Sequence, residues 1–241
     1  SKGNVIDPLE IIEEFGTDAL RMTMCSSGTQ SREIDLDRRK FEDFKNFANK
    51  VWNGARFVFM QVEDLNYDDA IDKALLTLED KWILSLLNQT IQKVDDSLSR
   101  YEFDKAAMTA YDFFWKEFCA YYVEIVKPTL FGKRGIPEER KNKQKILTVV
   151  LCASIRLIHP MAPFITEELF ANLKARFGEV KGTDPYTLDL RKSLDCISCA
   201  FAPYPQIIDP SDIQPAVEKS FSDLDRVVYT LRNIRGEMKL P

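Results

Sequence analysis

The chain has 241 residues, 45% of them hydrophobic, and a formal net charge of −5 at pH 7. A single histidine, His159, excludes histidine-rich metal clusters and paired-histidine acid–base sites. No apolar stretch is long enough to cross a bilayer and no signal segment opens the chain, while five cysteines suit a reducing compartment. We therefore expect a cytoplasmic protein without membrane attachment, and the start at Ser1 rather than methionine suggests a fragment of something longer.

Capping residues and apolar spacing predict an all-α architecture. Asp7 and Pro8 begin a short helix that Gly16 ends, a second short helix follows to Met24, and residues 26–31 form a loop. Apolar residues at steps of three and four then predict four long amphipathic helices. Their apolar stripes cover residues 41–58, 83–98, 107–125 and 146–157.

Prolines are expected to end two of these helices. The third helix should stop at Pro128 and the fourth at His159–Pro160, and a shorter helix should run from Pro163 to Gly178. Four helices of about 20 residues, joined by modest connections, are typical of a helical bundle.

The last sixty residues have a different pattern. Alternation in residues 195–201 predicts a short strand, and three prolines (Pro203, Pro205 and Pro210) make the following stretch extended. A final helix is expected from about Pro215 to Met238.

The first long helix has an unusual polar side. At 100° per residue, five side chains fall in one narrow sector roughly opposite the apolar stripe. They are Arg39, Asn46, Lys50, Asn53 and Phe57. Cations can neutralise phosphates, amides can bond to base edges, and an exposed aromatic ring can stack on an unpaired base. The alternative is an ordinary solvated helix face whose aromatic ring is tucked against a neighbouring helix.

Other candidate sites favour structural roles. The basic run at residues 132–145 could touch an RNA backbone, but a soluble loop entering a helix is the preferred interpretation. Cys196 and Cys199 form a lone CxxC pair, and with no second pair nearby we expect buried or half-buried thiols and no metal site. His159 is expected to satisfy a helix end rather than to act in catalysis.

Several segments resemble class I aminoacyl-tRNA synthetases. The opening SKGNVIDP (1–8) is similar to the stretch that follows the Lys-Met-Ser-Lys-Ser loop of that family, with Ser1 as the last residue of the loop. GTDALR (16–21) and SIRLIHPMAPFITEELF (154–170) also resemble the family. Within it, NFANKVWNGARFVFM (46–60) and RNIRGEM (232–238) are similar to the valyl branch.

The resemblance implies a division of the chain and a site. Residues 1–35 would be the end of the Lys-Met-Ser-Lys-Ser loop and a stem-contact linker, 36–180 an anticodon-binding helical bundle, and 181–241 an extended segment, a short strand and a helix. Four residues match anticodon-contacting places, and Asn46 joins them by geometry alone. The four are Arg39, Lys50, Asn53 and Phe57.

The resemblance also implies partners and chemistry. The expected partners are tRNA(Val) and the missing catalytic domain of the same chain, with the protein acting as a monomer. The parent would be a ligase that uses ATP and Mg²⁺, whereas this chain would hold no cofactor, metal or catalytic residue and would be inactive alone. Two alternatives stay open, an isoleucyl-type anticodon-binding domain and a helical scaffold that binds protein and no RNA.

Overall fold

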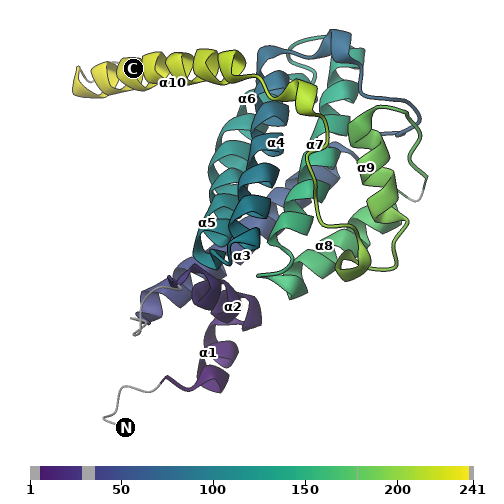
Figure 1. The fold of residues 1–241 in the computed structure, drawn as a ribbon. Coiled ribbons are helices and arrows are strands. Elements are labelled where there is room, and N and C mark those ends of the chain that lie inside the picture. Colours follow the sequence, from purple (N-terminus) through teal and green to yellow (C-terminus); the bar gives the residue numbers. More distant parts are fainter. Residues whose placement is uncertain (1–5, 29–35, 178, 239–241) are drawn as a thin grey trace.

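The computed structural model describes residues 6–28, 36–177 and 179–238, and this part of the chain is all-α, with no strand (Figure 1). Ser1 and residues 29–31, the second half of the predicted loop at 26–31, lie outside the described residues. In chain order the elements are α1 (Pro8–Phe15), α2 (Thr17–Ser26), α3 (Arg38–Gln61), η1 (Lys73–Leu75), α4 (Leu78–Ser99), α5 (Phe103–Asp112), η2 (Phe113–Tyr122), α6 (Val123–Leu130), α7 (Pro137–Ile158), α8 (Pro163–Arg176), α9 (Pro185–Leu194), η3 (Cys199–Phe201), η4 (Pro210–Asp212) and α10 (Pro215–Glu237).

Helix α7 lies at the centre of the bundle. Every residue from Asn142 to Ile158 is buried, and α7 contacts α3, α4, α5, α6, α8 and α9. From Ile146 on, this helix carries apolar residues on all sides rather than on one stripe, as a surrounded helix does, while the buried Lys143 and Lys145 before them form ion pairs. The predicted helical bundle is confirmed, with α7 as its core.

The third long helix of the bundle is a composite of α5, η2 and α6, which follow one another without a break from Phe103 to Leu130. Its middle section, η2, is π-helical and therefore wider than an α-helix, with hydrogen bonds from residue i to i+5. The predicted stripe is consequently wrong at its end, because Tyr121 and Ile125 are 36% and 39% exposed. Tyr122 and Val126 are buried in their place, at 0% exposure each.

The predicted stop at Pro128 is also wrong, since α6 continues to Leu130. A proline removes only its own backbone donor. Beyond it, the backbone N–H of Phe131 still donates to the Lys127 carbonyl at 2.9 Å, so the last turn closes around the proline.

The segment after the bundle is partly helical, while residues 202–209 lie outside any helix, in keeping with the extended stretch expected around Pro203 and Pro205. Pro185 occupies the first turn of α9, and Asp184 caps it by accepting hydrogen bonds from two backbone N–H groups at 3.1 Å. The predicted strand at 195–201 is wrong, because backbone N–H groups there donate to carbonyls three residues earlier and not to another strand. The N–H of Cys196 donates to the Ser193 carbonyl at 3.1 Å, and that of Phe201 donates to Ser198 at 3.2 Å. The residue boundaries of the three-part division stay a prediction.

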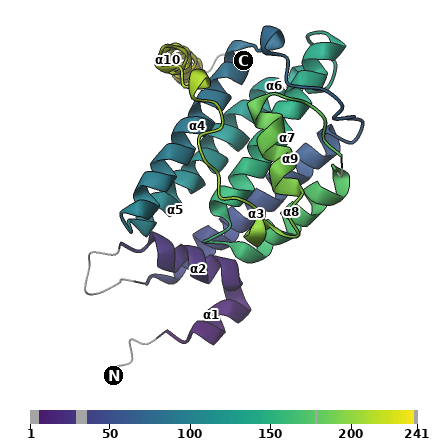
Figure 2. The same cartoon turned by 45° about the vertical axis from the view of Figure 1, so that its right-hand side comes forward.

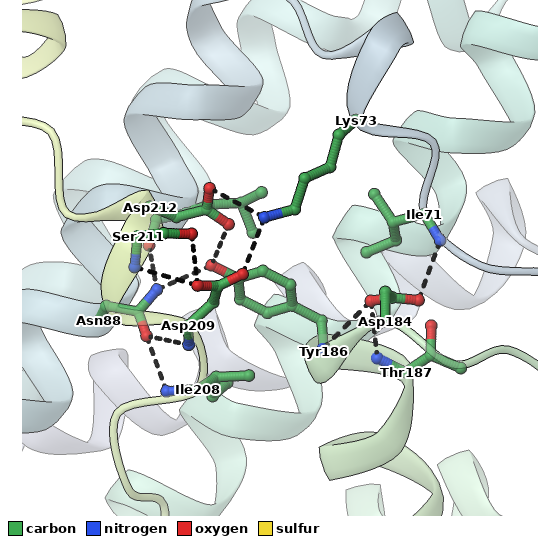
Figure 3. A network of polar contacts seen from close by, with 11 residues as sticks. Ile71, Lys73, Asn88, Asp184, Tyr186, Thr187, Ile208, Asp209, Ser211 and Asp212 are labelled. Carbon is green, nitrogen blue, oxygen red and sulfur yellow. Dashed lines mark hydrogen bonds and ion pairs between the residues drawn. The ribbon is translucent and has the colours of Figure 1, made fainter.

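A polar network fastens the connection between α9 and α10 to the bundle (Figure 3). The Asn88 side chain, on α4, accepts hydrogen bonds from the backbone of Ile208 and Asp209 at 2.8 and 3.1 Å. Lys73 lies 2.8 Å from an Asp209 oxygen, and the Tyr186 hydroxyl donates to Asp212 at 3.0 Å. These hydrogen bonds and this ion pair therefore attach the connection to the bundle, although little of it is helical.

The last helix, α10, docks by its first turns and then projects from the bundle (Figures 1 and 2). The Phe221 ring stacks on Trp82 of α4, with ring centroids 3.9 Å apart. Farther along, Leu224 and Leu231 are 51% and 56% exposed.

Helices α1 and α2 lie at the opposite end of the bundle from α10 (Figure 1). The Asp18 carboxylate accepts hydrogen bonds from the backbone of Phe164 and Ile165 at 3.1 and 2.8 Å, which caps α8. Arg21 donates to the Pro160 carbonyl at 2.8 Å. These contacts attach α2 to the start of α8.

Candidate nucleic-acid interface

All five predicted site residues lie on α3. Asp37 caps this helix by accepting a hydrogen bond from the Arg39 backbone at 2.9 Å, and six side chains of the opposite face are buried. Those six are Phe41, Phe44, Phe47, Val51, Ala55 and Val58. Burial of this stripe turns Arg39, Asn46 and Asn53 outward, whereas Phe57 packs partly against the core, as the alternative interpretation expects of the aromatic ring. We call the five residues Arg39, Asn46, Lys50, Asn53 and Phe57 the α3 strip.

The members of the α3 strip differ in exposure. Arg39, Asn46 and Asn53 are exposed, whereas Lys50 and Phe57 are half-buried. Eighteen residues separate Arg39 from Phe57, which at 1.5 Å per residue is about 27 Å along the helix. The strip is therefore longer than one base and has the length of several nucleotides.

The N-terminal end of the strip borders a hollow of about 480 Å³ between α1 and α3. Arg39 forms an ion pair with Asp37, with Nη2 2.6 Å from Oδ2, and this hydrogen bonding lowers the pKa of the Asp37 carboxyl. The Arg39 side chain stays 85% exposed, so the pair is a weak surface interaction. Asn46 and Lys45 line the same hollow, together with the carboxylates of Glu14 and Glu42.

The two half-buried members of the strip each meet a residue of the composite helix. Lys50 Nζ lies 5.4 Å from the centroid of the Trp115 ring. At the other end, Lys127 Nζ lies 5.4 Å from the centroid of the Phe57 ring. The sequence analysis missed Trp115 and Lys127, because helical periodicity relates only residues of one helix. These two residues lie far along the chain from their partners Lys50 and Phe57.

Gly54 permits this close approach. A Cβ atom at position 54 would lie 2.8 Å from Cys119 Sγ and 3.2 Å from the Phe114 ring of η2. A side chain here would force α3 and η2 apart, so glycine keeps the strip beside the composite helix.

The basic run at 132–145 is mainly structural. Residues 132–136 are an exposed turn, but the cations that follow face carboxylates of the bundle. Arg140 pairs with Asp64 at 2.6 Å, and the 2%-exposed Lys143 lies 2.9 Å from both oxygens of Asp80. The preferred interpretation, a soluble loop entering a helix, therefore matches the exposed turn and the start of α7, but it does not predict the burial of Lys143 and Lys145.

The remaining candidates also take structural positions. Cys199 is buried and Cys196 half-buried, and burial raises the pKa of the Cys199 thiol to about 12. His159 Nδ1 lies 2.8 Å from Thr166 Oγ1 at the turn into α8, and burial lowers the pKa of this histidine. Within the described residues no cluster of three or more histidine, cysteine or carboxylate side chains could hold a metal ion.

Searched over the same described ranges, no helix is long and apolar enough to cross a membrane.

Comparison with known proteins gives two family matches. A model described as the anticodon-binding domain of tRNA ligase matches residues 80–241. A second, described as tRNA synthetases class I (I, L, M and V), matches residues 1–37. The α3 strip lies between these two matched segments.

Curated relatives, unlike the two family models, match the chain over its whole length and so include the strip. The chain is 57% identical to a valine--tRNA ligase of Protochlamydia amoebophila and 49% identical to that of Chlamydia caviae, over 100% of its length in both cases. It spans only 27% and 26% of these relatives, about a quarter of their length. The fold resembles the Agrobacterium radiobacter K84 agnB2 LeuRS in a ternary complex with tRNA and LeuAMS, with a TM-score of 0.60 and 22% identity over 89% of this chain and 22% of that one. Because the first model matches well over half of its residues, the chain belongs to the family of anticodon-binding domains of tRNA ligases.

Proposed function

We propose that this chain is the anticodon-recognition part of a valine--tRNA ligase, and that it binds tRNA(Val). Valine--tRNA ligases at up to 57% identity over the whole chain support the valyl assignment. The observation that carries the proposal is the α3 strip, on which two cations, two amides and an aromatic ring share one sector of a helix and are exposed or half-buried.

Each strip residue has a role suited to its chemistry. The Phe57 ring stacks on an unpaired base, a contact that tolerates any base because every base has a π face. Asn53 and Lys50 bond to base edges or to phosphate, and Arg39 holds the backbone. Asn46 lies between Arg39 and Lys50 and adds a second amide by position.

The chemistry of the parent enzyme lies outside this chain. The parent attaches valine to tRNA(Val) with ATP and Mg²⁺, and this chain alone is inactive. Residues 1–37 match the class I synthetase model, and their described part holds no carboxylate cluster suited to a metal ion. We assign no step with ATP or Mg²⁺ to these residues. The catalytic domain of the same polypeptide is the expected protein partner, and a cytoplasmic monomer is the expected form.

The proposal is tested by titrating the chain with three RNAs at about 50 and about 200 mM salt. These are the tRNA(Val) transcript, the same transcript with a substituted anticodon, and the isoleucine tRNA transcript. Tighter binding to tRNA(Val) than to the other two supports the proposal. Preference for the isoleucine transcript would point to the isoleucyl alternative, and no binding at low salt would point to the protein scaffold.

A further inference from the structure

Helix α3 and the composite helix run side by side in the same direction, so that successive turns of one contact successive turns of the other. The Phe47 ring lies 4.4 Å from the Tyr111 ring, between centroids. One turn farther along both helices Lys50 faces Trp115, and a further turn on Gly54 faces Cys119. The α3 strip therefore borders a seam between two helices rather than standing alone on one.

Aromatic rings of the composite helix extend outward along this seam. Tyr111 and Trp115 stack with centroids 5.7 Å apart and planes at 7°, and Phe47 anchors both in the core. Trp115 is half-buried, so the stack ends at the surface beside Lys50. The ring is held rigidly by its neighbours, as a stacking platform for a base needs to be.

In the second contact across the seam, the cation and the ring come from the opposite helices to those of the first. At residue 50 the cation comes from α3 and the ring from η2, whereas at residue 57 the ring comes from α3 and the cation, Lys127, from α6. Seven residues of helix separate Lys50 from Phe57, which is about 10 Å. A stacked strand rises about 3.4 Å per nucleotide, so the two contacts lie about three nucleotides apart.

We propose that Trp115 and Lys127 form the second wall of the RNA interface, and that in free protein the two lysines occupy ring faces that bases take over in the complex. On binding, a base stacks on each ring and each ammonium moves to a phosphate. A surface cation–π contact is weaker than base stacking, and a phosphate is a stronger partner for Lys127 than the exposed Glu124 carboxylate that it pairs with in the free protein, so the exchange favours the complex. This inference rests on the proposed function, because it requires that the seam binds a single strand.

The ring contact is tested with Trp115→Leu, and Trp52→Leu is the matched control. Trp52 is 42% exposed on α3, about 160° around the helix from Lys50. Binding of the 241-residue chain to the anticodon stem-loop of tRNA(Val) is followed by fluorescence anisotropy. Trp115→Leu should weaken binding by about 5- to 150-fold, Trp115→Phe should restore most of the affinity, and the control should bind like the unaltered chain.

The cation is tested separately with Lys127→Met, which leaves the stack of Tyr111 and Trp115 in place. The control is Lys116→Met on the same helix, where the lysine pairs with Asp112 on the side that faces α4. Lys127→Met should reduce the slope of log affinity against log salt by about one, and Lys116→Met should not. This measurement decides the matter even if Trp115→Leu fails to fold.

The outcomes separate this inference from the proposed function. If the unaltered chain binds the stem-loop while Trp115→Leu and Lys127→Met behave like their controls, the second wall is wrong and the α3 strip stands. If the unaltered chain does not bind the stem-loop at all, the proposed function fails and this inference fails with it.

Discussion

The buried ion pair of Lys143 and Asp80 gives the sharpest prediction about stability. Lys143 Nζ lies 2.9 Å from both Asp80 oxygens and 2.8 Å from Thr77 Oγ1, and the Tyr122 hydroxyl donates to Asp80 at 2.8 Å. The side chains of the pair are 2% and 1% exposed. Asp80 also accepts from the Thr77 backbone at 3.0 Å as part of the capping box of α4. Lys143 also lies 3.1 Å from a Glu79 oxygen, so one cation balances two carboxylates, of which the buried Asp80 joins α4, η2 and α7.

Replacing Lys143 with methionine leaves the Asp80 carboxylate buried without its cation. Removing one partner of a buried pair costs about 3–5 kcal/mol, because the remaining charge loses its compensation. A chain of this size changes its melting temperature by about 2–4 °C per kcal/mol, so we expect a drop of about 6–20 °C. Calorimetry or circular dichroism measures the drop.

Two further variants test whether the loss of stability comes from the uncompensated buried charge. Lys141→Met, on the same helix, removes a cation that is 38% exposed and paired with Asp68, and should cost less than about 1 kcal/mol. Asp80→Leu combined with Lys143→Met removes both charges and should be more stable than Lys143→Met alone. A loss below about 1 kcal/mol for Lys143→Met, or a double variant less stable than the single one, would refute the reasoning.

Three other predictions concern the interface and the thiols. Phe57→Ala should weaken RNA binding by about 1–3 kcal/mol, measured by titration with the tRNA(Val) stem-loop; unchanged affinity would contradict the strip. Gly54→Ala should lower the free energy of unfolding by about 1 kcal/mol in a urea titration, because crowding against Cys119 outweighs the gain in helix propensity, and a more stable variant would contradict this. Burial raises the pKa of Cys152 to about 11, so its thiol stays protonated at pH 8, and iodoacetamide should modify Cys196 well before it; equal rates would contradict the burial.

The sequence predicts the α3 strip because that helix obeys one simple period. Its apolar residues recur at helical spacing from Phe41 to Val58, all of the predicted stripe except the half-buried Ala48 is buried, and the polar sector follows from the same geometry. The roles of the strip residues in RNA binding remain a prediction.

The period fails where the backbone departs from the α-helix. The sequence carries no visible mark of the π-helical section, so the stripe is projected onto Tyr121 and Ile125 when Tyr122 and Val126 are the buried residues. Similarly, residues 195–201 alternate like a strand, but the strand would need a partner and local turn bonds satisfy the backbone instead.

Contacts between segments that are distant in the sequence are the second feature that could not be predicted from it. Lys143 looks like one cation of a soluble basic run because its partner, Asp80, is 63 residues away. Trp115 and Lys127 escape notice for the same reason, since only the packing of α3 on the composite helix brings them to Lys50 and Phe57.

The central claim is that the α3 strip reads an anticodon, and the most direct measurement compares two RNA stem-loops that differ only in that triplet. We expect the chain to bind the tRNA(Val) stem-loop more tightly than the one with a substituted anticodon, and Phe57→Ala together with Asn53→Ala to remove most of this difference. Equal affinity for the two stem-loops, with both falling together as salt rises, would mean that the chain supplies only electrostatic docking and would contradict the claim.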